Sequence, residues 1–242
     1  MSSQLVQRTS QRLTAVLLMS GAVIGAIGNT LHPHAAVSMT AKLQAIAGNE
    51  AWVAIHLTIL VAILLVIGGL VGLARLLDGG PGGPLTAIAI AAALVGGALA
   101  TVSTSIDGFA MKPLALDWAV ASTSDAAAML GLAGAVEMVG FAVWSMAILV
   151  LFGGAFAGFG AALVQSRQFP AWLGWVAIVS GVGSAVAALL QIANTGELQA
   201  AETLFFASSV LATVWAFAVG VLVWRDGRAP DGARFPGSLA VH

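Results

Sequence analysis

Cysteine and tyrosine are absent from this sequence of 242 residues, and charged residues make up only 8% of it. Without cysteine, the chain has no disulfide, no thiolate metal site and no cysteine nucleophile. Soluble domains carry about 25% charged residues, so this chain has too few to cover a surface that faces water. Because 60% of its residues are hydrophobic, we expect membrane lipid to surround most of it.

Clustered positive charge is also missing. The nine lysines and arginines are outnumbered by ten acidic residues, which gives a formal net charge of -1. Nucleic-acid binding requires clustered lysine and arginine that neutralise phosphates. Nucleic acid is therefore excluded as a partner.

Long apolar runs are abundant. A bilayer core about 30 Å thick requires about 20 apolar residues per helix. The sequence predicts an all-α, polytopic transmembrane bundle of six helices that forms a single domain over residues 1–224. The six predicted spans are residues 13–31, 52–76, 85–106, 127–152, 171–193 and 203–224.

Two features of the connections can be predicted as well. In the fourth run, apolar residues continue to Val164, and we expect the helix to break at Gly153–Gly154. Segments 32–51 and 107–126 are expected to be long outer loops, the first of which contains a short surface helix at Ala41–Ile46. At the start of the second loop, Asp107 and Lys112 lie close in sequence, which suggests a surface ion pair or an anion site.

The distribution of cations predicts the orientation, because lysine and arginine are retained in short cytoplasmic loops. If the N-terminus is inside, only Lys42 and Lys112 fall outside. The seven cations that then fall inside are Arg8, Arg12, Arg75, Arg167, Arg225, Arg228 and Arg234. We therefore expect a multi-pass protein of the bacterial cytoplasmic membrane with both termini in the cytoplasm, and a disordered cytoplasmic tail over residues 225–242.

Polar residues gather in the outer half of the predicted spans, whereas the inner half is almost purely apolar. Because polar groups in a membrane usually face the bundle interior, we expect an outward-facing polar cavity that binds a small or lipophilic ligand. The candidate ligand-binding residues are Trp52, Asn29, Trp144, Gln191, Asn194 and Glu202. The leading hypothesis is an accessory, binding or transport-related protein.

The alternative hypothesis is a membrane-embedded enzyme, an isomerase, cyclase or hydrolase acting on a lipid or isoprenoid. Glu137 is the deepest acid, and burial without a nearby cation favours a neutral carboxyl that could donate a proton. His56 or Asp107 would then act as the base. The competing interpretation is structural: Glu137 bonds a neighbouring helix, and His56 is a satisfied interfacial histidine.

Five residues could also contribute to a metal site. His32, His34 and His56, with Glu137 or Asp107, could supply three or four ligands. Histidines in loops at helix ends are common without a metal, so the spacing permits a metal ion without favouring one, and the cofactor content stays open.

Glycines recur at a spacing that brings helix backbones close together in lipid. The pairs are Gly21 with Gly25, Gly68 with Gly72, and Gly154 with Gly158. We expect them to pack helices within one bundle, while a homo-oligomer remains open.

One segment carries a resemblance. Phe169-Pro-Ala-Trp-Leu-Gly-Trp175 resembles the helix entry of a broad group of uncharacterised small bacterial polytopic proteins. The start of the second span, Trp52-x-x-x-His56, followed by Gly68-Gly-Leu-Val-Gly-Leu-Ala-Arg75, is similar to that group as well. The resemblance implies a six-helix bacterial membrane protein of unknown activity, with no site residues to transfer.

Overall fold

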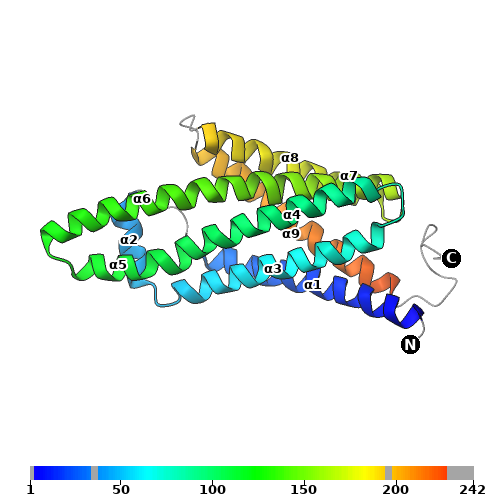
Figure 1. Cartoon of the computed structure of the whole chain (residues 1–242), viewed down its shortest axis with the longest axis horizontal. Helices are drawn as coiled ribbons and strands as arrows, with labels where there is room; N and C mark the ends of the chain where they lie inside the picture. The colour runs from blue at the N-terminus through cyan, green and yellow to red at the C-terminus, as the bar shows by residue number, and fades with distance from the viewer. Residues whose placement is uncertain (1–2, 34–37, 194–197, 228–242) are drawn as a thin grey trace.

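The computed structural model describes residues 3–33, 38–193 and 198–227, and the described chain is all-α (Figure 1). Its elements follow one another along the chain in a simple order. They are α1 (Ser3–Leu31), α2 (Met39–Gly48), α3 (Trp52–Leu77), α4 (Gly83–Ser105), the π-helix η1 (Ile106–Ala110), α5 (Met111–Val120), α6 (Thr123–Ala147), the π-helix η2 (Ile148–Ala155), α7 (Phe156–Ser166), α8 (Ala171–Ala193) and α9 (Leu198–Asp226).

Six stretches of the described chain are long and apolar enough to cross a membrane, which confirms the predicted six-helix bundle. They are Val6–Leu31, Trp52–Leu77, Gly83–Val120, Thr123–Ser166, Ala171–Ala193 and Leu198–Asp226. A short helix is present at the expected segment Ala41–Ile46, as α2. His34, Asn194 and residues 228–242 lie outside the described residues, while Arg225 and Asp226 belong to α9.

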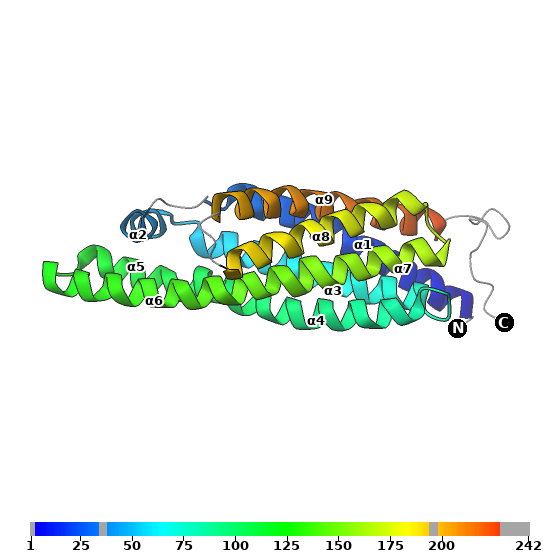
Figure 2. The same ribbon diagram turned by 90° about the horizontal axis from the view of Figure 1, so that it is seen from above.

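Two of these stretches are much longer than a bilayer requires. The helix formed by α4, η1 and α5 has 38 residues, and the helix formed by α6, η2 and α7 has 44. At about 1.5 Å per residue they measure roughly 57 and 66 Å. The α5–α6 hairpin therefore extends past the ends of the other spans (Figures 1 and 2).

These long helices correct two expectations from the sequence. Residues 107–120 of the expected second loop are helical, and a tight turn precedes α6, where the Ser122 side chain accepts a bond from the Asp125 amide. The expected break at Gly153–Gly154 is wrong, because both glycines lie within η2 and the helix continues into α7. A π-helical turn retains backbone hydrogen bonds, which a break inside the hydrocarbon would leave unsatisfied.

Close backbone contacts hold the bundle together. Helix α1 packs on α3 and α9, α8 packs on α9 and α7, and α4 packs on α3 and η2. A Cβ atom at Gly21 in α1 would lie 2.9 Å from the backbone nitrogen of Val66 in α3. One at Gly158 in α7 would lie 2.9 Å from the Cβ atom of Ala89 in α4. These spaced glycines thus face neighbouring helices of the same chain, as predicted.

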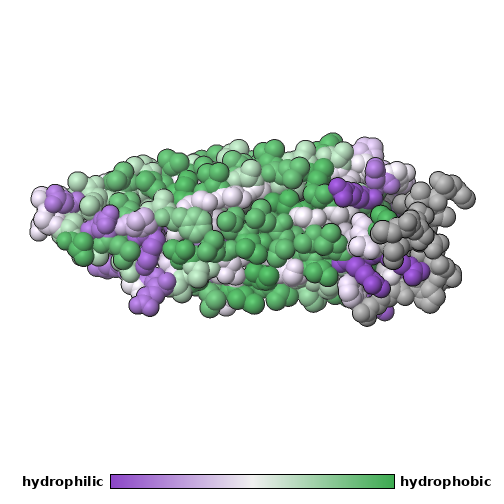
Figure 3. Space-filling view, turned by 60° about the horizontal axis from the view of Figure 1, so that its bottom comes forward, coloured by the Kyte–Doolittle hydropathy of each residue, from purple (hydrophilic) through white to green (hydrophobic). Residues whose placement is uncertain are grey.

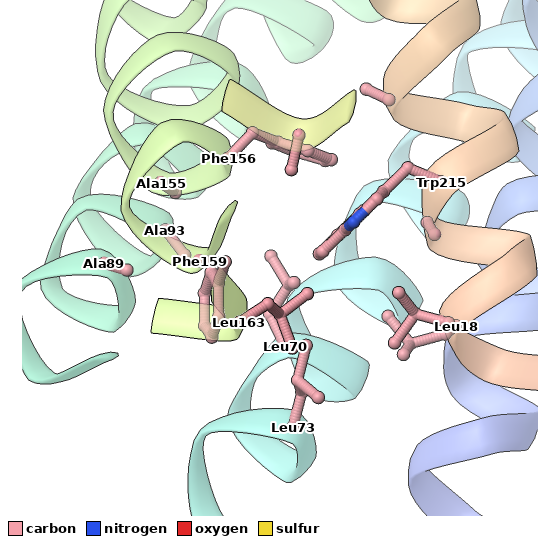
Figure 4. Packing of buried hydrophobic residues seen from close by; sticks show 14 of the residues in the cluster. Leu18, Leu70, Leu73, Ala89, Ala93, Ala155, Phe156, Phe159, Leu163 and Trp215 are labelled. Atoms are coloured by element: carbon pink, nitrogen blue, oxygen red, sulfur yellow. The ribbon is translucent and has the colours of Figure 1, made fainter. Parts of the chain in front are cut away.

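Large apolar side chains fill the middle of the bundle. Trp215 from α9 lies close to Phe156, Leu18 and Leu70, which come from three other elements (Figure 4). Figure 3 shows a hydrophobic surface over the middle of the molecule and hydrophilic residues toward its two ends. We name these ends the arginine end, which contains Arg75, Arg167 and Arg225, and the cluster end, which contains α2 and the α5–α6 hairpin.

A second, smaller apolar cluster positions α2 at the cluster end. Leu43 and Ile46 of α2 are fully buried against Met111 and Ala115 of α5 and Ala133 of α6. This packing fixes α2 beside the hairpin (Figure 2).

Candidate functional site

Five titratable side chains from separate parts of the chain meet at the cluster end. His32 follows the last residue of α1, Lys42 belongs to α2, His56 to α3, Asp107 to η1 and Glu137 to α6. We name these five residues the His–Asp–Lys–Glu cluster. The structure thus brings together the three candidate catalytic residues and two of the three candidate metal ligands.

The cluster lies near one edge of the apolar layer. His56 and Arg75 are 19 positions apart in the same helix, which corresponds to about 28 Å along the helix axis. The hydrocarbon core of a bilayer is about 30 Å thick. If Arg75 lies at one interface, the cluster lies at the other.

The π-helix η1 brings Asp107 against α3. Its Gly108 packs directly on His56, so closely that a Cβ atom at Gly108 would overlap the histidine side chain. The indole nitrogen of Trp52 donates to the backbone oxygen of Asp107 at 2.9 Å. Single π-helical turns are frequent at functional sites, and here Asp107 in the turn contacts both histidines.

Two imidazoles and one carboxylate form a compact triangle of polar atoms. His56 Nε2 lies 3.0 Å from Asp107 Oδ2, and His32 Nε2 lies 3.4 Å from the same oxygen. The two Nε2 atoms are 3.2 Å apart. The indole of Trp52 packs on both imidazoles, with centroid separations of 4.6 Å to His56 and 5.6 Å to His32.

The Nδ1 atom of His56 is assigned its hydrogen from its backbone partner. Its Nδ1 lies 2.8 Å from the Trp52 backbone oxygen, which can only accept a hydrogen bond, so Nδ1 carries a hydrogen. In the neutral ring, Nε2 is then an unprotonated acceptor that faces the Asp107 carboxylate, another acceptor. Either a second proton or another cation between these atoms relieves that conflict.

Lys42 joins the two acids of the cluster. Its Nζ lies 2.7 Å from Glu137 Oε2 and 3.1 Å from Asp107 Oδ1. Burial alone would lower the pKa of Lys42, but the charges of Asp107 and Glu137 and their hydrogen bonds outweigh it and raise the pKa above 10.5. The lysine is therefore charged at neutral pH.

This contact corrects the expectation that Glu137 has no cation nearby. The sequence analysis missed Lys42 because its distance from the acids depends on how α2 packs. A signal was present in the charge count, since Lys42 and Lys112 are the only cations predicted on the side that carries both Asp107 and Glu137.

Lys112 has a different role from the one expected for it. Its Nζ donates to the backbone oxygens of Ile46, Ala47 and Asn49 at 2.8, 3.1 and 3.0 Å. A cation favours the last carbonyls of a helix, so Lys112 holds the C-terminal end of α2. The expected ion pair of Asp107 with Lys112 is replaced by the pair with Lys42.

The candidate ligand-binding residues are only partly gathered. Trp52 packs on the cluster, whereas Asn29 is exposed and bonds the Gly25 carbonyl of its own helix. Trp144 packs on Phe205 and Phe152, and buried Gln191 accepts a bond from Ser145 at 3.0 Å. Glu202 is exposed on α9. Trp144 and Gln191 thus hold helices together, and the expected cavity stays a prediction.

In chemical terms, the cluster can accept a cation. The charges of its two carboxylates and one ammonium sum to -1 when both imidazoles are neutral.

No family model matches the chain, and no curated protein or solved structure matches it. Its function must therefore be inferred from the geometry of the cluster.

Proposed function

We propose that this polytopic membrane protein is a binding protein whose small ligand is a cation, held by the His–Asp–Lys–Glu cluster. The observation that carries the proposal is the convergence of three polar atoms: His56 Nε2 lies 3.0 Å from Asp107 Oδ2 and 3.2 Å from His32 Nε2. Such an arrangement is stable when a proton or another cation lies among the three atoms.

Burial and charge support this proposal. The His56 side chain is only 2% exposed, and that of Asp107 is 25% exposed, so water compensates little for an unfavourable contact. His56, Asp107 and Glu137 lie within candidate membrane spans, where titratable groups are costly and usually functional. When both imidazoles are neutral, the net charge of -1 in this half-buried site attracts a cation.

The arginines support an orientation as well. Arg75 and Arg225 lie in the last turns of α3 and α9, and cytoplasmic ends are rich in such residues. We place the arginine end and both termini in the cytoplasm and the cluster on the extracytoplasmic face of a bacterial cytoplasmic membrane.

Single cysteines at the exposed positions Asp117 and Asp78 test this orientation. A membrane-impermeant maleimide should label Asp117→Cys but not Asp78→Cys in intact cells, and the reverse pattern contradicts the orientation.

Thermal melting of the detergent-purified protein tests cation binding. The concentration of one cation is varied at a time, at constant ionic strength. The cations are protons, sodium, divalent metal ions and tetramethylammonium. At least one should raise the melting temperature of the wild type and fail to do so in Asp107→Asn. The matched variant Asp117→Asn, which removes an exposed carboxylate from α5, should respond like the wild type. If no cation produces a shift that depends on Asp107, the proposed function is wrong.

The second candidate is the membrane-embedded enzyme with Glu137 as general acid. The position of Glu137 at the expected height of lipid head groups favours it. The His56 side chain is only 2% exposed, against 25% for Asp107, so Asp107 is the better base. The enzyme predicts that Glu137→Gln abolishes turnover of a lipid or isoprenoid substrate while the protein still folds, and retained turnover argues against it.

A further inference from the structure

We propose that the cation is a divalent first-row transition metal ion of the zinc class, bound by His32 Nε2, His56 Nε2 and Asp107 Oδ2. The proposal rests on the function proposed above and names the ligand of that same site. It takes three members of the ligand set expected from the sequence, with Asp107 as the carboxylate, because Glu137 instead pairs with Lys42.

The separations of the three atoms match a metal coordination shell. Zinc binds imidazole nitrogen at about 2.0–2.1 Å in tetrahedral geometry, which places neighbouring ligand atoms about 3.3–3.4 Å apart. The three edges here measure 3.2, 3.0 and 3.4 Å. The triangle is therefore close to one face of a coordination tetrahedron before any side chain moves.

The surroundings of these ligands also resemble a metal site. A metal-binding histidine usually donates its second ring hydrogen to a carbonyl or carboxylate, which fixes the tautomer and the ring orientation. His56 does this through Nδ1 to the Trp52 carbonyl at 2.8 Å. The second carboxylate oxygen of Asp107 is held by Lys42 at 3.1 Å.

The donor set selects the class of ion. Imidazole suits zinc, copper, iron and nickel, whereas magnesium and calcium prefer shells made of oxygen atoms. Three protein ligands leave a fourth position for water or a substrate, as in catalytic zinc sites. A divalent ion changes the charge of the cluster from -1 to +1, so hydroxide or an anionic group suits that fourth position.

Metal binding can be measured directly on the purified, chelator-stripped protein. Zinc chloride should bind with one ion per chain by elemental analysis, and magnesium chloride should not compete. Cobalt(II) should give the strong visible absorption of a four-coordinate site. His32→Ala and Asp107→Asn should each weaken zinc binding by about a hundredfold or more, since loss of second-shell partners alone costs about 10–100-fold. Asp117→Asn should bind zinc like the wild type.

Two controls keep the outcome clear. The variants must elute and melt like the stripped wild type, and His32→Gln replaces His32→Ala if the alanine variant does not fold. Zinc that fails to bind, or that binds both variants as tightly as the wild type, overturns the metal proposal. If another cation then still gives stabilisation that depends on Asp107, the proposed function stands without the metal, and if none does, both fail.

Discussion

The middle of the bundle and its cluster end are built from different interactions. In the middle, alanine, glycine and large apolar side chains pack with little polar contact, and the described bonds between helices join neutral groups such as Ser180 and the Ser208 carbonyl. At the cluster end, five titratable side chains from five separate segments of the chain share one network.

This difference indicates that the middle stabilises the fold, whereas the cluster end carries the proposed function. Lipid solvates apolar side chains as well as a protein interior does, so helices in the middle associate through close packing. Charged groups at the membrane edge carry a desolvation cost that packing does not require. Three substitutions can break or sharpen the distinction.

The largest effect is expected where a methyl group enters the packed middle. A Cβ atom at Gly181 in α8 would lie 2.6 Å from the backbone nitrogen of Ala157 and 2.8 Å from the Gly153 oxygen. Backbone atoms cannot move aside as a side chain can, so Gly181→Ala should lower the free energy of unfolding by about 2–3 kcal/mol. Denaturant titration in detergent measures this loss.

The matched control is an alanine in the projecting hairpin. A Cβ atom at Gly131 in α6 meets nothing within 4 Å, and alanine is favoured over glycine in a helix by up to about 1 kcal/mol. Gly131→Ala should therefore be neutral or stabilising. Equal losses at both glycines would contradict the idea that the middle depends on closer packing than the projecting hairpin does.

An intermediate effect is expected at Lys112. Lys112→Met removes three charge-assisted bonds to the end of α2, which should cost about 1–2 kcal/mol. Because α2 carries Lys42, amide exchange across Met39–Gly48 should accelerate and cation binding at the cluster should weaken. Lys112→Arg retains the charge and should preserve most of the protection of the α2 amides from exchange. Unchanged exchange in the methionine variant would mean that apolar packing alone holds α2.

The number of spans could be predicted from the sequence, because the length of an apolar run is set directly by bilayer thickness. The helical continuation through η1 and η2 could not. Glycine pairs and polar residues normally suggest an end, but Gly153 here faces Ala185 of α8, and that contact favours an unbroken backbone. Such tertiary support is not visible in a single segment.

The site, like the fold, could be predicted from the sequence only in part. Ordering polar residues by depth identified His32, His56, Asp107 and Glu137, since these groups are rare in a chain with 8% charged residues. Lys42 was missed, because its contact with Glu137 spans 95 positions and depends on the packing of Leu43 and Ile46. Gln191 was misjudged for a related reason: its polar partner, Ser145, lies on another helix.

The smallest effect is expected for a hydrogen bond in the middle. Ser180 Oγ donates to the Ser208 carbonyl at 2.8 Å, but that carbonyl also belongs to the backbone ladder of α9, so Ser180→Ala leaves it satisfied. Side-chain bonds between membrane helices average about 0.6 kcal/mol, and the loss should be of that order by denaturant titration. Ser209→Ala, which removes a bond within α9, should change stability by less than about 0.5 kcal/mol. A loss at Ser180 as large as that at Gly181 would show that the middle also depends on polar contacts, and the contrast with the cluster end would no longer hold.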